Sequence, residues 1–475
     1  MLNLKRIDLG KDEAEQDANL HRYFVKTPAY NACLEGKKYI VLGRKGSGKS
    51  AIFTLLNDEL SKENLTIQIT PDQYAWSTLR SYKEVGISVE HAHTNAWKLT
   101  ILSAVIWKLN DMNMLKSTSK LVPYYKYFKD NYDPSDKNWF LNIAEKAKQV
   151  LEKVKIEGIS FDFSSSIGTP LKIVNELKLL LKNEWPNGVK VFVLFDRLDD
   201  SWDASDDSRY LLVGLFKAIA ELNAHFSGLF SCITFIRSDI YNSLIFDDQD
   251  KIREYEQNII WNTATLKTLI CERVRVSLET TEDDSAIWKQ LFSEKSYRSK
   301  ASPEKYLIDR TFKRPRDLIS LVRLAIEKAI ENNHECIETT DTRLVEEERY
   351  SESKYRDLII ENQKQYPYIK DLLDAFSSRL HIISIEDLRQ ICADTIKRKN
   401  IDVTIEQLIR FLFSIGFIGV KRKGRAGVRQ RGGESIFYSY DDSTLNPIAY
   451  SEFYIHTALR IYLNITEKRQ VKKGA

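Results

Sequence analysis

The residues best suited to do chemistry lie at positions 43–51, where a glycine-rich run follows a short apolar stretch. The run satisfies the pattern G-x-x-x-x-G-K-[ST], which ends here in Lys49 and Ser50. Glycines let the backbone curl until N–H groups point at phosphate oxygens, and a following helix directs its positive end at the same anion. The predicted phosphate-binding residues are Gly43, Arg44, Lys45, Gly46, Ser47, Gly48, Lys49, Ser50 and Ala51. The motif predicts a site for a nucleoside triphosphate, with Lys49 on the β- and γ-phosphates and the Ser50 hydroxyl on Mg²⁺.

A second candidate for the same site is Asp196, which ends the strongest apolar run of the chain, residues 190–195. A run that is apolar at nearly every position is typical of a strand buried on both faces of a parallel sheet. A carboxylate at the carboxyl end of such a strand lies at the crevice where ligands bind in open α/β sheets. We therefore expect Asp196 to hold the Mg²⁺ shell together with Ser50, as the acid of a Walker B motif does.

The elements that must position these residues form a regular α/β pattern. Strands are expected at 39–42, 65–70, 190–195, 229–236 and 258–261, and helices at 92–109, 170–183 and 206–225. Their order favours a parallel sheet. In this sheet an extra strand lies between the strand that precedes the glycine-rich run and the strand that ends at Asp196. The predicted fold class is an α/β P-loop NTPase, with a core over residues 1–263 and a helical insertion near 110–170.

Two further domains are expected after the core. Residues 264–346 have only helical patterns, which is the size and position of a helical lid. Residues 350–466 follow the order of a winged helix, since predicted capping boxes at Ser384 and Thr404 open two helices and two short strands then flank a glycine-rich loop. Residues 467–475 form a short basic tail.

The loop of the predicted wing is strongly cationic. Six cations fall within eleven residues and no acid lies among them: Lys421, Arg422, Lys423, Arg425, Arg429 and Arg431. Removing these six charges from the net charge of +4 leaves −2, so the positive excess of the chain resides in this loop. Such a loop suits nucleic-acid phosphates, and the alternatives are a solvated loop or one that docks on an acidic protein.

Composition excludes other classes of protein. The five cysteines include no C-x-x-C pair, so neither a zinc site nor a disulfide framework is indicated. The charged start of the chain lacks a signal-peptide pattern, and no apolar run approaches the ~20 residues needed to span a bilayer. We expect a cytoplasmic protein without a membrane partner.

With both motifs, a polar residue after the fourth strand, a lid and a winged helix, the chain resembles AAA+-related ATPases of the STAND and origin-recognition type. More narrowly, GRKGSGKSA at 43–51, FDRLDDSW at 195–202 and FIRSDIY at 235–241 resemble an uncharacterised bacterial P-loop ATPase family, often encoded among genes for defence against phage. The spacing from Asp196 to Asp199 is also similar to that of KAP-type NTPases. The three motifs cover the core; the later regions match only in general layout.

The resemblance implies roles for two arginines. Arg237 falls at the sensor 1 position and Arg316 at a sensor 2 element, where each would reach the γ-phosphate and stabilise charge that gathers during phosphoryl transfer. The alternatives are a surface arginine at a strand end for Arg237 and an ion pair with Asp317 for Arg316.

The resemblance also implies slow turnover. Many AAA+ ATPases place a glutamate directly after the Walker B aspartate, whereas this chain has Arg197, which cannot accept a proton. Asp199 is the expected activator of water, with Asp200 as the alternative. No N-K-x-D motif is present, so ATP is the expected nucleotide.

Two functions remain open at this point. The first is an ATPase that acts as a nucleotide-dependent switch in antiphage defence, with an effector protein or further copies of itself as partners. The second is an ATP-dependent DNA-binding protein of the origin-recognition type that uses its winged helix. No nuclease constellation is legible in the sequence.

Overall fold

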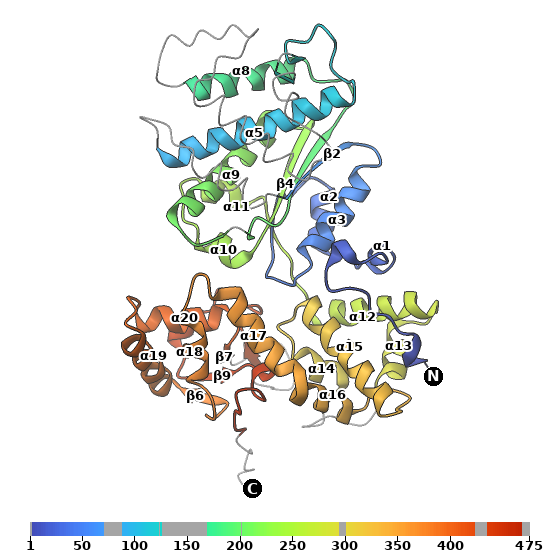
Figure 1. Ribbon diagram of the computed structural model, residues 1–475, viewed down its shortest axis with the longest axis vertical. Helices are drawn as coiled ribbons and strands as arrows, with labels where there is room; N and C mark the ends of the chain where they lie inside the picture. The colour runs from blue at the N-terminus through green and yellow to red at the C-terminus, as the bar shows by residue number, and fades with distance from the viewer. Residues whose placement is uncertain are drawn as a thin grey trace, which may run out of the picture.

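The computed structural model describes residues 2–70, 88–122, 124–125, 169–200, 202–293, 301–422 and 435–467. The described residues form two bodies stacked along the longest axis of the molecule (Figure 1). The upper body is an α/β core built around a sheet, and the lower body contains helices and a second, smaller sheet. Most of the insertion predicted near 110–170 lies outside the described residues.

The sheet of the core has five parallel strands in the order β2-β3-β4-β1-β5. The strands are β1 Ile40–Leu42, β2 Leu65–Ile69, β3 Val191–Phe195, β4 Phe230–Ile236 and β5 Glu256–Asn258. The prediction of an extra strand is confirmed, because β4 lies between β1 and β3. The fifth strand was predicted two residues too late: beyond Ile259, whose N–H still donates to the Leu42 carbonyl, the chain leaves the sheet towards the next helix.

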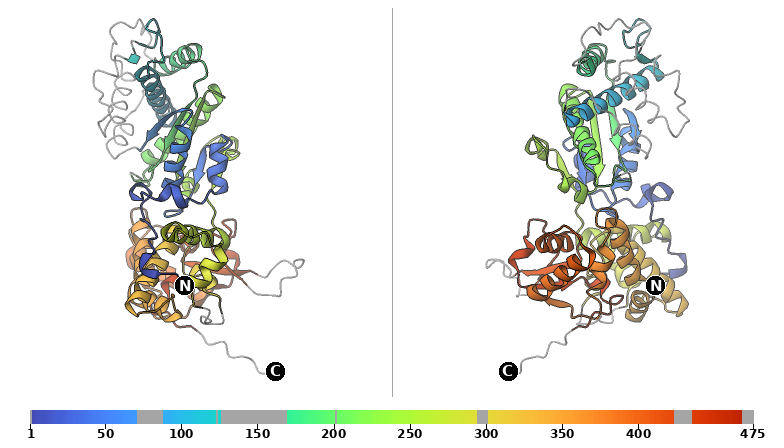
Figure 2. Two further views of the ribbon diagram at one scale, coloured as in Figure 1. Left: turned by 90° about the vertical axis from the view of Figure 1, so that its right-hand side faces the viewer. Right: turned by 60° about the vertical axis from the view of Figure 1, so that its left-hand side comes forward.

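Helices cover this sheet on both faces (Figures 1 and 2). Their bounds are α1 Leu20–Tyr23, α2 Pro28–Leu34, α3 Lys49–Leu60, α5 Val89–Asp111, α8 Thr169–Asn183, α9 Asp206–His225, α10 Ser238–Ser243 and α11 Gln249–Arg253. α5 is buried almost all round because it packs against both α8 and α9. Its crossing with α9 is close: a Cβ at Gly214 would lie 2.9 Å from the backbone of His93.

The lower body begins with the predicted lid. Its helices are α12 Thr263–Leu278, α13 Asp284–Leu291, α14 Pro303–Ile308, α15 Pro315–Glu331, α16 Thr339–Val345 and α17 Ser351–Asn362. A π-helical turn, Glu346–Tyr350, joins α16 to α17 without a break. The continuous helix from Thr339 to Asn362 was not predicted, and it carries the chain from the lid to the next domain.

The winged helix follows, and the predicted fold class is confirmed. Its elements are α18 Ile369–Asp374, β6 Ile382–Ser384, α19 Ile385–Lys399, α20 Ile405–Ser414, β7 Ile418–Arg422, β8 Ser435–Phe437 and β9 Glu452–Ile455, with an antiparallel sheet in the order β6-β9-β7-β8. The capping box predicted at Thr404 is present. At Ser384 only its first half forms, because the Asp387 carboxylate accepts from the Ser384 hydroxyl rather than from its backbone N–H, which lies in β6.

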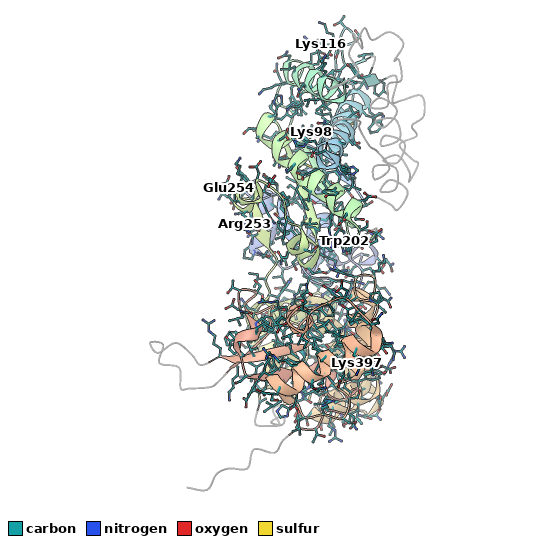
Figure 3. All side chains as sticks on the ribbon, turned by 90° about the vertical axis from the view of Figure 1, so that its left-hand side faces the viewer. Lys98, Lys116, Trp202, Arg253, Glu254 and Lys397 are labelled. Atoms are coloured by element: carbon teal, nitrogen blue, oxygen red, sulfur yellow. The ribbon has the colours of Figure 1, made fainter. Side chains whose placement is uncertain are left out.

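The lid and the winged helix share one hydrophobic cluster, which also includes Leu4 and Leu9. The start of the chain therefore packs on the lid although it was predicted within the core, and Figures 1 and 2 place the N-terminus on the lower body. In Figure 3, Trp202, which follows β3, lies near the boundary between the bodies, and Lys397 of α19 lies in the lower one. None of the described helices is long and apolar enough to cross a membrane.

Candidate nucleotide-binding site

The glycine-rich run joins β1 to α3 and shapes the first part of the site. Gly46 and Gly48 have φ values of +78° and +94°, which side chains other than glycine rarely adopt. A Cβ at Gly46 would also lie 3.2 Å from the Cβ of Arg316, which belongs to the lid. α3 begins at Lys49, so its N-terminal N–H groups and its positive dipole end face the loop.

A cavity of about 560 Å³ lies beside this loop, between the core, the lid and the N-terminal segment. We call it the P-loop cavity. The residues predicted for the site that line it are Lys45, Gly46, Gly48, Lys49, Ser50, Ala51, Asp196, Asp199 and Arg316. The fold thus gathers residues from three sequence regions in one cavity.

Lys49 is nearly buried, with 9% of its surface exposed. Its ammonium group donates to the carbonyls of Gly43 at 3.2 Å and Arg44 at 3.4 Å. Burial lowers the pKa of Lys49, and the charges of Asp199 and Asp196 oppose that shift. Both acceptors are neutral carbonyls, so the charge of this buried ammonium group is not matched by a contact with a carboxylate at hydrogen-bond distance among the described contacts.

Asp196 is 2% exposed and lies at the end of β3, as predicted. Burial raises the pKa of this carboxyl group, while hydrogen bonds from the Ser50 hydroxyl and a backbone N–H at Arg197 oppose the rise. The contact between Ser50 and Asp196 brings a hydroxyl and a carboxylate oxygen together. This pair of hard oxygen donors fits Mg²⁺, which takes one or two protein oxygens beside substrate phosphates.

The two candidate bases have different surroundings, although both line the P-loop cavity. Asp200 is paired with Arg197, whose Nη2 lies 2.7 Å from the Asp200 carboxylate. Arg197 has a left-handed φ of +59°, which turns the chain sharply after β3. Among the charged groups that oppose the lowering of the pKa of Lys49, Asp199 has the largest effect. The Asp199 carboxylate is therefore the better placed of the two with respect to the predicted phosphate site.

Arg316 lies against the P-loop, with its N–H donating to the Gly46 carbonyl at 3.4 Å. Its predicted alternative partner, Asp317, is engaged elsewhere: the buried Asp317 carboxylate pairs with Lys354 at 2.8 Å and accepts from the N–H of Phe312 at 3.2 Å. The arrangement favours the phosphate-facing interpretation of Arg316 over the helix-starting ion pair.

Arg237 lies outside the P-loop cavity. It lines a second cavity of about 700 Å³ between the core and the winged helix, which we call the interdomain cleft. Asp239 holds its guanidinium group with two contacts, at 2.6 and 3.1 Å, and the carbonyl of Glu361 accepts a third at 3.3 Å. The predicted γ-phosphate sensor is thus engaged by the lower body in this structure.

Arg44 also turns to the cleft instead of the P-loop cavity. Its guanidinium group donates to the carbonyl of Phe312 and lies 4.6 Å from the ring centre of Tyr440. Burial lowers the pKa of Arg44 to about 10. The Arg44 backbone remains part of the P-loop, while its side chain connects that loop to the lid and the winged helix.

One wall of the P-loop cavity was missed in the sequence. The cavity is lined from the N-terminal segment by Leu20, Tyr23, Phe24 and Val25, together with Leu269 and Ile319 of the lid. Arg273 of α12 fixes this segment, because it contacts the Asp17 carboxylate and donates to the carbonyl of Leu9. The apolar run Tyr23-Phe24-Val25 was the available signal. Its partners lie more than 240 positions away along the chain.

The basic wing lies largely outside the described residues, which include Lys421 and Arg422 but not Lys423, Arg425, Arg429 or Arg431. Arg422 Nη1 lies 3.1 Å from the carboxylate of Asp442. At least this cation is partly neutralised within the chain.

Comparisons with known proteins give three kinds of similarity. A family model described as the FunZ-associated C-terminal helical domain matches residues 264–359, from α12 to α17. An 80.3 kDa protein of transposon gamma-delta from Escherichia coli K12 is 26% identical over 437 residues, which are 87% of this chain and 62% of that protein. The chain therefore spans about 62% of the length of this relative.

Allergen Alt a 2 of Alternaria alternata is 30% identical over 148 residues, which are 30% of this chain and 76% of the allergen. Over that stretch the two proteins belong to one family, and the name of the fungal protein states no activity.

Solved structures with a similar course of the chain include Cdc6p from Pyrobaculum aerophilum, with a TM-score of 0.33 at 12% identity, covering 85% of this chain and 90% of that one. The Aeropyrum pernix ORC2 protein in ADPNP–ADP complexes has a TM-score of 0.37 at 12% identity, with 95% and 91% covered. Drosophila ORC bound to DNA has 0.32 at 10%, with 96% and 92% covered. These TM-scores all lie below 0.5.

Proposed function

We propose that the chain binds ATP with Mg²⁺ in the P-loop cavity, hydrolyses it slowly and uses the state of the nucleotide to move the lid and the winged helix. One observation carries this proposal: Lys49, the Ser50–Asp196 pair and the lid residue Arg316 all line a single cavity. A cavity closed partly by the lid changes shape when the lid moves, so occupancy and domain position are linked.

Each residue then has a defined task. Lys49 leaves the carbonyls of Gly43 and Arg44 to bind the β- and γ-phosphates. Ser50 and Asp196 would hold Mg²⁺, which neutralises charge on the phosphate oxygens when bound. Asp199 would accept the proton of the attacking water. The apolar wall formed by Leu20, Tyr23, Phe24 and Val25 would hold the adenine base.

The finer role follows from the motif resemblance. We propose a cytoplasmic switch in bacterial antiphage defence that acts on an effector protein or on further copies of itself. Slow turnover suits a switch. We expect slow turnover because Arg197, the residue after Asp196, cannot accept a proton, and the candidate base Asp199 lies in the turn that follows. A switch requires only that ATP and ADP favour different positions of the lower body.

The Asp196→Ala variant tests the enzymatic part. It should still bind ATP but lose Mg²⁺-dependent release of phosphate by at least about a hundredfold, since the metal-holding carboxylate is gone. Asp206→Ala is the matched control, because Asp206 is an exposed acid that pairs only with Arg209 among the described contacts. Turnover that survives in Asp196→Ala would contradict the site assignment.

A second candidate function, DNA binding, is supported by the charge of the wing. If the wing contacts phosphates, changing Arg422, Arg425, Arg429 and Arg431 to alanine should weaken DNA binding and make its salt dependence shallower. An unchanged salt slope would speak for a protein partner or a solvated loop.

A further inference from the structure

The carboxyl end of α17 is held by a residue from the other body. The last four carbonyls of a helix have no donor within the helix and need partners from outside. Here the Glu361 carbonyl accepts from Nη2 of Arg237 at 3.3 Å. The carbonyls of Leu358, Ile359 and Asn362 accept hydrogen bonds from donors within residues 362–366, so their partners come from the same segment of the chain. Arg237 therefore acts as a cap on α17, supplied across the interdomain cleft.

The cap has two favourable components. A guanidinium group at a helix C-terminus interacts with the negative end of the helix dipole as well as with the carbonyl itself. Asp239 fixes the direction of Arg237 through two contacts, and only 13% of the Arg237 side chain is exposed. The guanidinium group is thus oriented by the core and offered to α17.

Glu361 also ties the end of α17 to the start of α15 within the lid. Its carboxylate accepts from Nη1 of Arg314 at 3.0 and 3.2 Å, and both side chains are nearly buried. Arg314 lies two residues before Arg316, which lines the P-loop cavity. A third contact joins the segment after α17 to the core, because the Lys364 ammonium group donates to the Asp200 carbonyl at 3.4 Å. At the end of α17 the lid contacts the core and the chain continues into the winged helix.

We propose that Arg237 is shared between two acceptors: it caps α17 when no γ-phosphate is present, and it turns to the γ-phosphate when ATP is bound, which releases α17 and the winged helix behind it. This inference rests on the proposed function. Arg237 is near the phosphate site, since the N–H of the next residue, Ser238, donates to the Gly43 carbonyl, which also accepts from the Lys49 ammonium group. A phosphate oxygen is a stronger acceptor for a guanidinium group than a neutral carbonyl is. The γ-phosphate of ATP would therefore replace the Glu361 carbonyl as the acceptor of Arg237. ADP lacks that group and leaves the cap in place.

Hydrogen exchange of the full chain tests the proposal in its unaltered form. The reporters are the amides of Gln363 and Tyr366, which donate to the carbonyls of Ile359 and Asn362 at the end of α17. The chain is measured alone, with saturating ADP and with saturating AMP-PNP, each with Mg²⁺. We expect exchange about tenfold or more faster with AMP-PNP than with ADP, because a hydrogen bond to a charged group is lost at this helix end.

The Arg237→Gln variant removes the cap and the sensor together. It should exchange quickly in all three states, with no difference between ADP and AMP-PNP. Arg356→Gln is the matched control: Arg356 lies on α17 itself and forms an exposed pair with Glu352. This control should keep the wild-type difference between the two nucleotides.

The outcomes separate the inference from the function on which it rests. If AMP-PNP binds but leaves the two amides of the wild type as slow as ADP does, the shared-cation proposal is overturned while nucleotide binding stands. If titration calorimetry finds no nucleotide binding, both fall. The comparison of ligands in the unaltered chain needs no variant, so poor folding of Arg237→Gln does not prevent a decision.

Discussion

The P-loop separates two cavities of similar size that differ in kind. The P-loop cavity contains groups that bind phosphate and metal in many proteins, and these groups are close together in the sequence apart from Asp196 and Arg316. The interdomain cleft contains Arg44 of the P-loop and Arg237, which follows β4, and both donate to carbonyls of the lower body. The P-loop cavity gathers groups whose chemistry suits a phosphate ligand, whereas contacts across the interdomain cleft join the core to the lower body.

The largest effect is expected at Lys49. Lys49→Ala removes the buried cation of the P-loop cavity, and losing one partner of a buried charge contact costs about 2–5 kcal/mol, or roughly thirtyfold to several thousandfold in the dissociation constant for ATP. Lys62→Ala is the matched control, because Lys62 is an exposed lysine just after α3 that pairs with Glu59 and lies outside the P-loop cavity. Titration calorimetry decides, and equal losses in the two variants would contradict the assignment.

Asp317 belongs to α15 and fixes this helix to α17 through its ion pair with Lys354. Burial alone would raise the pKa of Asp317, but Lys354 and Arg314 outweigh it and hold the pKa at about 2. A carboxyl group with a lowered pKa stabilises the fold above its unfolded pKa of about 4, and that contribution, about 2 kcal/mol, is lost as the pH falls from 4 to 2.

Asp317→Asn should therefore lower the free energy of unfolding by about 3 kcal/mol at pH 7, with a smaller deficit near pH 2. Urea unfolding at several pH values measures it. Asp357→Asn, which removes the exposed partner of the same lysine, should cost less than about 1 kcal/mol. Similar costs for the two variants would show that burial of the pair has no special importance.

Arg237 and Arg316 sharpen the comparison, since one lies in each cavity and both are predicted to read the γ-phosphate. Each change to alanine should weaken ATP binding by about ten- to a hundredfold and leave ADP binding within about threefold, because only ATP carries the contacted group. Dissociation constants for both nucleotides test this. Equal losses for ATP and ADP would mean that these arginines support the fold instead.

The last prediction concerns the difference in turnover between variants of the two candidate bases in the P-loop cavity. Asp199→Asn should lower turnover by about a hundredfold or more, as loss of a general base does. Asp200→Asn should have a smaller effect because Asp200 pairs with Arg197. Steady-state phosphate release at saturating ATP makes the measurement, and a reversed order would transfer the role to Asp200.

The sequence allowed the P-loop cavity to be anticipated better than the cleft for a physical reason. The motif that contains Lys49 and Ser50 encodes a local backbone shape, and strands such as β3 are marked by continuous apolar residues. The cleft depends on contacts between distant residues, such as Arg44 with Phe312, 268 positions apart, and Arg237 with Glu361, 124 apart. Neither Phe312 nor Glu361 lies in a motif that would predict its contact, so these two contacts are recognised only in the folded chain.

The same reasoning explains the elements that were missed. The π-helical turn at Glu346–Tyr350 lets α16 continue into α17 where sequence patterns favour two separate domains. β6 and β9 are short, and they pair across about seventy residues, which gives little local signal. The role of Asp17 and Tyr23 in the wall of the P-loop cavity depends on Arg273, whose charge belongs to the lid.

The course of the backbone between the two bodies has a mechanical consequence. Among the described residues, the chain crosses from one hydrophobic cluster to the other twice, between Leu9 and Ala29 and again between Ile259 and Leu266. Two separate crossings restrict the motion of one body relative to the other mainly to rotation about the line that joins the crossings. The shared cluster of the lower body makes it turn as one rigid lever. A small rotation at the P-loop would then swing α19, on the side away from α12 in Figure 1, through a much longer arc.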